Sequence, residues 1–121
     1  MKREIKFRGK TPKGKWFFGN FRKLENYCYV GDEVEHYCIE ETIEQYTGLK
    51  DKNGIDIFEG DILKTATDKP MIVGWSDKFA SFVLNRSGWV FSHWFGESCN
   101  PEDCEVIGNK YDNPELLQDL V

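Results

Sequence analysis

Residues 45–64, with the sequence QYTGLKDKNGIDIFEGDILK, constrain the fold more than any other part of this chain. A polar turn at residues 51–54 separates two apolar segments. Residues 59–61 then lead into the alternating segment 61–64, which predicts a strand. The residues predicted to shape these turns are Gly48, Asn53, Gly54, Gly60 and Asp61.

The composition favours a mostly β protein. The chain has 121 residues, of which 15% are aromatic, and aromatic side chains favour strands. Its length fits one domain, or two small lobes that share a core. No segment approaches the ~20 apolar residues of a membrane span. Residues 1–10 carry positive charge without an apolar stretch, so we expect no secretory signal and a cytosolic protein.

The net charge of −5 is unevenly distributed. Residues 1–23 hold nine Lys or Arg and one acid, a net charge of +8, whereas residues 24–121 hold seven basic and twenty acidic residues, a net charge of −13. This asymmetry indicates either a nucleic-acid arm or two complementary faces, within one chain or between copies. The candidate basic face, which is either solvated or a phosphate-binding stripe, consists of Lys6, Arg8, Lys10, Arg22 and Lys23.

Turn residues divide the rest of the chain into strands. A first hairpin covers about residues 1–24, with 16–21 as its returning strand. A second joins 26–30 to 35–39, and further strands are predicted at 71–75, 79–84 and 105–108. A short helix closes the chain, with Asn113 as its N-cap, Pro114 in its first turn, and an apolar stripe formed by Leu116, Leu117, Leu120 and Val121.

The densest aromatic run, residues 88–96, predicts a strand that is apolar on both faces. Such a strand can be buried on one side and covered on the other by another subunit or by the first hairpin. The candidate interaction surface consists of Trp89, Phe91, Trp94 and Phe95.

Four cysteines and two histidines raise the question of a metal site. The cysteines are Cys28, Cys38, Cys99 and Cys104, and the histidines are His36 and His93. Neither cysteine pair has the two-residue spacing of a zinc knuckle, so buried or partly exposed thiols are the alternative to zinc. The second hairpin would bring Cys28 and Cys38 together through its turn alone.

The nearest candidates for catalysis are Asp56, Glu59 and Asp61, followed by Lys64. Three carboxylates with a lysine could hold magnesium and steer a phosphate. A Gly-Asp step entering a strand is also ordinary turn chemistry, in which the carboxylate accepts hydrogen bonds from nearby backbone N–H groups. Neither histidine lies in a triad context, and no phosphate loop is present in the sequence. We therefore expect no catalytic residue, metal or cofactor.

Three segments together resemble the YopX family of phage and prophage proteins. They are residues 3–10 with 16–19 (REIKFRGK and WFFG), residues 45–54 continuing through 58–62 (QYTGLKDKNG and FEGDI), and residues 106–109 with 111–117 (VIGN and YDNPELL). The central segment is specific, and the outer two are weak alone. The departures from the family pattern are Glu44, Phe58 and Lys110.

The resemblance implies a small barrel similar to SH3 folds, preceded by hairpins, in a protein of mobile-element origin in a bacterial cytoplasm. It implies no activity and no functional residues. We expect one YopX-like unit over residues 1–121, with hairpins in 1–44 and a barrel-like core with a closing helix in 45–121.

These observations favour a non-enzymatic module that binds a host or phage protein or assembles with itself. The alternative is a barrel that binds single-stranded nucleic acid, in which Trp16, Phe18 and Trp89 stack on bases and the basic face binds phosphates. The acidic remainder of the chain opposes that alternative. A metal-dependent phosphodiesterase is a second alternative.

Overall fold

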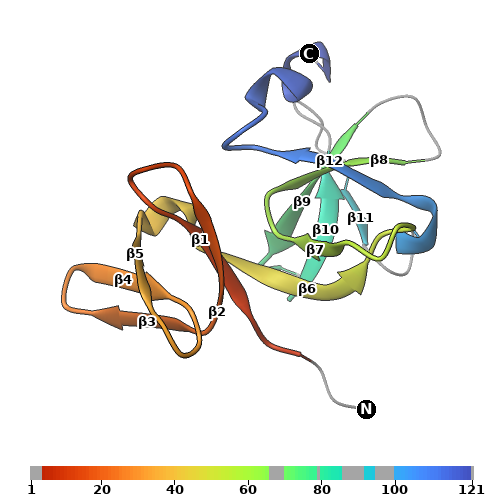
Figure 1. Cartoon of the computed structure of the whole chain (residues 1–121). Helices are drawn as coiled ribbons and strands as arrows, with labels where there is room; N and C mark the ends of the chain where they lie inside the picture. Colours follow the sequence, from red (N-terminus) through yellow and green to blue (C-terminus); the bar gives the residue numbers. More distant parts are fainter. Residues whose placement is uncertain (1–3, 66–69, 79, 86–91, 95–99, 121) are drawn as a thin grey trace. The chain divides into compact units, whose positions relative to one another are not determined.

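The computed structural model describes residues 4–65, 70–78, 80–85, 92–94 and 100–120. In these ranges the chain is mostly β, as its composition predicts, and its strands form small, curled antiparallel sheets (Figure 1). The strands are β1 (Phe7–Lys10), β2 (Trp16–Gly19), β3 (Phe21–Leu24), β4 (Tyr27–Val30), β5 (His36–Cys38), β6 (Glu44–Lys50), β7 (Asp56–Phe58), β8 (Asp61–Lys64), β9 (Met71–Ser76), β10 (Ser81–Asn85), β11 (Ser92–Trp94) and β12 (Glu105–Asn109). The 3₁₀-helices are η1 (Glu40–Thr42), η2 (Pro101–Asp103) and η3 (Pro114–Leu120).

The chain divides into two compact units, residues 1–48 and 49–121. The sequence places a lobe boundary after residue 44, where a new motif begins. The boundary between the two compact units falls within β6, whose first residues pair with β1 in the sheet order β2-β1-β6-β7.

The first unit consists of two sheets packed face to face. β1 pairs with β2 and with the start of β6, while β3, β4 and β5 form a three-stranded sheet whose central strand contacts β1 and β2. Phe7 packs on Phe21 with ring centroids 5.5 Å apart. Gly9 lies so close to Cys38 that a Cβ on the glycine would come within 2.9 Å of the sulfur.

The predicted single strand over residues 16–21 is wrong, because the chain turns a corner at Gly19 and Asn20. Gly19 has a φ of +141° and passes against Gly31 and Asp32, where no side chain would fit. The Asn20 N–H donates to Asp32 Oδ1 at 3.1 Å. As a result β2 remains with β1, whereas β3 pairs with β4 in the other sheet.

The second unit contains a five-stranded antiparallel sheet in the order β11-β10-β9-β8-β12. Strands β8 to β11 follow one another as a meander, and β12 returns to pair with β8. The alternation of apolar residues directs one face of these strands inward. The core of the unit consists of Ile57, Leu63, Met71, Val73, Leu84 and Cys104.

Asp51 connects the turn after β6 to the start of β12. Its Oδ1 accepts the N–H groups of Asn53 at 2.8 Å and Ile55 at 2.9 Å, and its Oδ2 accepts the N–H of Val106 at 2.9 Å. The side chain is only 6% exposed. Burial by itself raises the pKa of this carboxyl, but the three N–H donors outweigh it and hold the pKa below its ordinary value of 3.8.

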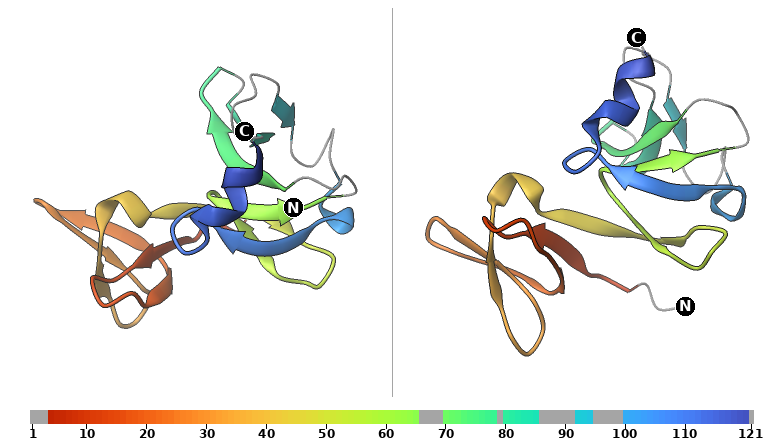
Figure 2. Two further views of the ribbon diagram at one scale, coloured as in Figure 1. Left: turned by 90° about the horizontal axis from the view of Figure 1, so that it is seen from above. Right: turned by 45° about the horizontal axis from the view of Figure 1, so that its top comes forward.

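The closing segment is a seven-residue 3₁₀-helix, η3, rather than the regular helix that the sequence predicts (Figure 2). Asn113 directly precedes η3, at the N-cap position that the sequence predicts. Its Oδ1 accepts the N–H of Asn109, at 3.2 Å, and the Asn113 C=O accepts the Leu116 N–H in a tight three-residue turn. Short helices lack the length to stabilise themselves, and 3₁₀ geometry is common in such pieces.

Within the described ranges, we find no helix with both the length and the apolar character that crossing a membrane requires.

Substituting Gly9 with alanine tests the packing of the two sheets in the first unit. The new Cβ would lie 2.7 Å from Ile43 Cδ1 and 2.8 Å from Cys38 Cβ, so we expect a loss of about 1–3 kcal/mol in the free energy of unfolding. The control is Gly74→Ala in β9, where the nearest atom, Asn85 Nδ2, is 3.1 Å away. Urea denaturation followed by tryptophan fluorescence measures both. Equal losses would contradict this account of Gly9.

Replacing Asp51 with asparagine should cost about 1–3 kcal/mol, because the amide nitrogen would face a buried N–H donor. The folded-state pKa of Asp51 is lowered, so its stabilisation is complete above the unfolded value near 3.8 and disappears as the pH falls through the folded value. The difference in stability between wild type and Asp51→Asn should therefore shrink in acid. Asp103→Asn, at an exposed carboxylate, is the control variant and is measured over the same pH series.

Candidate functional site

Three tyrosines gather on the outer face of the β3-β4-β5 sheet. Strand register places Tyr27 opposite Leu24, and Tyr29 opposite both Arg22 and Tyr37. Directly paired residues share a face, and the alternate pairs, which include Cys28 and Cys38, point into the unit. We call Arg22, Leu24, Tyr27, Tyr29 and Tyr37 the tyrosine face.

The tyrosine face is exposed and internally ordered. Leu24, Tyr27 and Tyr37 are 54%, 52% and 46% exposed. Tyr37 makes edge contacts with the rings of Tyr27 at 5.8 Å and Tyr29 at 6.3 Å. A large apolar surface of this kind, with phenol hydroxyls available, is typical of a protein contact surface.

Arg22 is held over this face by Glu35. Its Nη2 lies 2.6 Å from Glu35 Oε2, its Nε donates to both carboxylate oxygens, and its guanidinium lies 5.4 Å from the Tyr29 ring centroid. The hydrogen bond to Glu35, and then the charge of that carboxylate, raise the pKa of Arg22. The face is therefore neutral, with one cation and one anion side by side.

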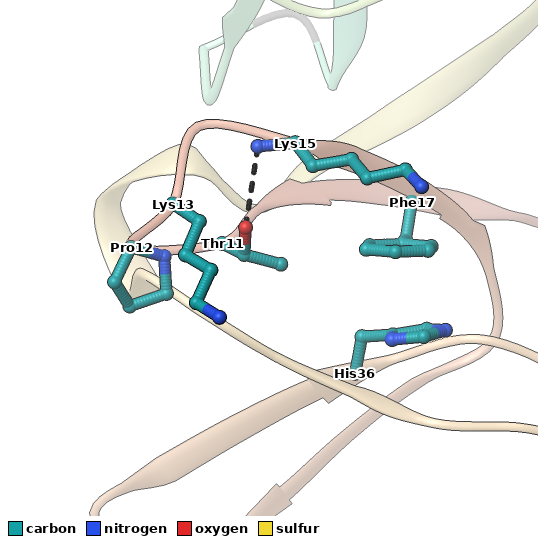
Figure 3. Close-up of a pocket in the computed structure, with 6 residues that line it drawn as sticks. All are labelled: Thr11, Pro12, Lys13, Lys15, Phe17 and His36. Atoms are coloured by element: carbon teal, nitrogen blue, oxygen red, sulfur yellow. Dashed lines mark hydrogen bonds between the residues drawn. The ribbon is translucent and has the colours of Figure 1, made fainter.

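A pocket of about 350 Å³ lies between the β1–β2 turn and β5 (Figure 3). Phe17 and His36 stack at one side of it, with ring centroids 3.4 Å apart and nearly parallel planes. The residues lining it are Thr11, Pro12, Lys13, Lys15, Phe17 and His36.

Arg8, one member of the predicted basic face, is buried rather than solvated. Its Nε and Nη2 donate to Glu44 Oε1 at 3.0 and 2.8 Å, and the two side chains are 8% and 2% exposed. Its guanidinium also lies 4.9 Å from the Trp16 ring centroid. Arg8 is therefore engaged within its own unit.

Other members of the basic face also have partners in the first unit. Lys23 pairs with Glu40 at 2.9 Å, and this hydrogen bond, followed by the charge of the carboxylate, raises the pKa of the lysine. Lys6 pairs with Glu4 and lies over the Tyr46 ring, and Lys10 lies 5.9 Å from the Trp16 ring centroid. Residues 1–48 hold nine basic and eight acidic residues, a net charge of only +1. The positive charge of the N-terminal basic residues is thus largely compensated by acidic residues of the same unit.

The structure does not place the predicted aromatic interaction surface. Trp89, Phe91 and Phe95 lie outside the described residues. Trp94 belongs to β11, where its backbone is opposite Val83 of β10. Of the residues proposed to stack on bases, Phe18 is 54% exposed and Trp16 lies beneath Arg8.

The candidate catalytic carboxylates have structural partners. Asp61 is 2% exposed, and its Oδ2 accepts the Phe58 N–H at 2.8 Å across the turn that enters β8. Asp56 forms an ion pair with Lys50. Gly48, Gly54 and Gly60 all have positive φ, and Asn53 donates its N–H to Asp51. Asn53, Gly54 and Gly60 thus lie in turns, whereas Gly48 lies within β6 and Asp61 begins β8.

Cys28 and Cys38 are direct cross-strand partners, as the second hairpin predicts, and both are buried free thiols. Burial is the main cause that raises the pKa of Cys38. Cys104 lies in the core of the other unit, and Cys99 is outside the described residues. Among the residues that the structure describes, no three His, Cys, Asp or Glu side chains are grouped as metal ligands would be.

The sequence carries a signal for the tyrosine face that was missing from the predicted interaction surface. The hairpin that pairs Cys28 with Cys38 necessarily pairs Tyr29 with Tyr37 on the opposite side. Period-two alternation then adds Tyr27 to that side. The pocket had no such signal, because it depends on how two sheets pack.

Comparison with known proteins identifies the family. The family model described as YopX protein matches residues 6–118, nearly the whole chain. The chain belongs to the YopX family. A search among curated proteins finds no match.

The fold of this YopX protein is similar to that of a solved structure. The crystal structure of protein EF1440 from Enterococcus faecalis is 28% identical in sequence, with a TM-score of 0.58. The match covers 97% of this chain and 100% of that one. The fold is therefore shared with a second protein.

Removing one partner of the buried Arg8–Glu44 pair tests how much the pair contributes to the stability of the fold. Glu44→Ala would remove the carboxylate that accepts two hydrogen bonds from the buried Arg8 guanidinium, and we expect a loss of about 3–5 kcal/mol in the free energy of unfolding. The double variant Arg8→Leu with Glu44→Leu should lose less than either single leucine variant, because it removes both buried charges. Glu35→Ala, at the exposed pair, should change stability far less. Chemical denaturation measures all five variants, and additive losses in the double variant would contradict this interpretation.

Proposed function

We propose that this YopX protein acts through protein contacts rather than catalysis, and that its tyrosine face binds a second copy of the chain. The observation that carries the proposal is the exposure of Leu24, Tyr27 and Tyr37 on one ordered sheet face. Tyrosine is enriched in interface hot spots because it combines large apolar area with a hydroxyl and few rotatable bonds.

Charge supports a second copy as the occupant. Arg22 and Glu35 lie together on a neutral face, so a twofold contact can place each Arg22 near the Glu35 of the other copy. The first unit is close to neutral as a whole, with a net charge of +1. A long polyanion would be repelled by the carboxylates that already pair with Arg8, Arg22 and Lys23.

The edge of the sheet supports the same contact. β3 is an edge strand in the order β3-β4-β5, and all four of its residues are exposed. An open edge offers backbone N–H and C=O groups to another strand. Phe21 and Leu24, which are 38% and 54% exposed, add apolar area there.

Sedimentation velocity over a concentration series tests the proposal. We expect the wild type to form a dimer whose population rises with concentration. The double variant Tyr27→Ser with Tyr37→Ser should have a dissociation constant at least tenfold larger. Ile55→Ser, at a residue that is 52% exposed in the second unit, is the matched control and should leave the dimer unchanged.

Two outcomes would overturn the proposal. A wild-type chain that remains monomeric at the highest soluble concentration would exclude the second copy as the occupant. A dimer that survives the double tyrosine substitution would place the contact elsewhere, for example on the aromatic segment 88–96. Circular dichroism of each variant verifies that folding is intact.

Two finer assignments belong to this proposal. We infer that the second unit is an SH3-like barrel, supported by the meander β8–β11, the 3₁₀-helix η2 and the return of β12 to β8. We also infer a bacterial cytoplasm and a phage or prophage origin. The buried free thiols Cys28, Cys38 and Cys104 suit a reducing compartment, and the family resemblance supports the origin.

A further inference from the structure

Backbone hydrogen bonds hold the walls of the pocket between the β1–β2 turn and β5 in place. The Thr11 N–H donates to the Lys15 C=O and the Gly14 N–H donates to the Thr11 C=O, both at 2.9 Å, and these bonds close the turn. The Ile39 N–H donates to the Lys10 C=O at 2.9 Å, which joins the residue after β5 to the end of β1. The pocket therefore lies between two segments that are fixed to each other, as is usual for a preformed binding site.

The surface that lines this pocket is almost wholly apolar. Figure 3 shows Pro12 on one side of the space and the stacked rings of Phe17 and His36 on the other. Because the two ring centroids are only 3.4 Å apart, nothing can enter between them, and the ring edges border the space. The edge of an aromatic ring is positive and favours contact with the negative face of another ring. An aromatic side chain between Pro12 and these edges therefore gains a contact that an aliphatic side chain lacks.

Two cations border the apolar space on different sides. Lys13 and Lys15 form no ion pair with any carboxylate in the described part of the chain. In Figure 3 the Lys13 side chain runs along the side of Pro12, whereas Lys15 extends over Phe17, with its Nζ 5.3 Å from the ring centroid. This arrangement suits an apolar group that has a separate negative charge on either side of it, rather than one compact anion.

We propose that this pocket docks a protein partner through one aromatic residue that is flanked on both sides by acidic residues. The aromatic side chain fills the space beside Pro12 and the ring edges, and its acidic neighbours lie near Lys13 on one side and Lys15 on the other. The volume of about 350 Å³ is at the small end of the range for ligand pockets, about 300–1,000 Å³, and suits one large side chain with its adjoining backbone. Binding energy in protein interfaces is concentrated in such anchors, which fill a pocket and exclude water.

The docking site is separate from the tyrosine face. His36 and Tyr37 are neighbours in β5, so their side chains point to opposite faces of the sheet. The inference shares with the proposed function only the premise that this protein acts through protein contacts. Peptide docking and dimerisation are measured independently, so that a failure of one is distinguished from a failure of the other.

Fluorescence anisotropy with labelled synthetic peptides tests the proposal on the full chain. The probe has a central tryptophan between pairs of glutamates, and we expect saturable binding at moderate salt. Replacing the tryptophan with alanine, or all the glutamates with lysines, should each weaken binding at least tenfold, because the first change removes the anchor and the second places like charges together. A peptide with serines in place of the glutamates should have intermediate affinity.

Three results with these probes would overturn the proposal. Absence of saturable binding by the glutamate peptide would exclude the docking site. Equal affinity for the alanine peptide would exclude an aromatic anchor. Free indole that binds as tightly as the glutamate peptide would assign the pocket to a small apolar molecule instead of a protein partner.

The matched variants are Lys13→Gln with Lys15→Gln and, as a control of equal charge change, Lys52→Gln with Lys64→Gln in the second unit. The first pair should weaken binding of the glutamate peptide at least fivefold and leave the serine peptide within about twofold, and the control pair should leave both within about twofold. Equal losses in the two pairs would overturn the role of the pocket lysines.

Amide NMR shifts on addition of the glutamate peptide should concentrate at residues 11–17 and at His36, which line the pocket. Shifts centred on residues 22–29 would place the peptide on the tyrosine face and overturn the proposal. Sedimentation velocity should show the same dimer in both pairs of lysine variants, because these lysines lie outside the tyrosine face.

Discussion

The carboxylate of Asp51 is the interaction on which the second unit most depends. It satisfies two N–H groups of its own turn and the N–H of Val106, which is 55 residues away in the sequence. The Lys52 N–H also donates to the Cys104 C=O, so two bonds join the turn to the segment that enters β12. β12 in turn pairs with β8. A local turn thereby fixes where β12 returns to the five-stranded sheet.

The first unit depends on a different constraint, the close approach of two small sheets. Gly9 lies against Cys38, and Gly19 lies against Gly31, at distances that exclude side chains. Such contact leaves little room for a large apolar core, and several aromatic side chains remain on the outside. Because aromatic side chains remain outside the closely packed sheets, the same unit carries both the exposed tyrosine face and the pocket beside Phe17 and His36.

Charge organises the first unit as well. The basic residues of the first 23 positions and the acidic residues that follow them meet across the strands as Arg8–Glu44, Arg22–Glu35 and Lys23–Glu40. Of these pairs only Arg8–Glu44 is buried, and the exposed pairs hold side chains in place more than they stabilise the fold. Lys13 and Lys15 belong to none of these pairs, and Arg22 with Glu35 leaves the tyrosine face neutral.

The sequence by itself determined the β class, the family, the hairpin that pairs Cys28 with Cys38, and the turns at residues 51–54 and 59–61. These features are local: period-two alternation and turn chemistry act within a few residues. Tertiary structure decided that Arg8 is buried, that the chain leaves its first hairpin at Gly19, and that residues 114–120 close as a 3₁₀-helix. It also decided where the tyrosine face and the pocket lie. Those outcomes depend on which sheets pack together and which charges meet, and such contacts join residues far apart in the sequence.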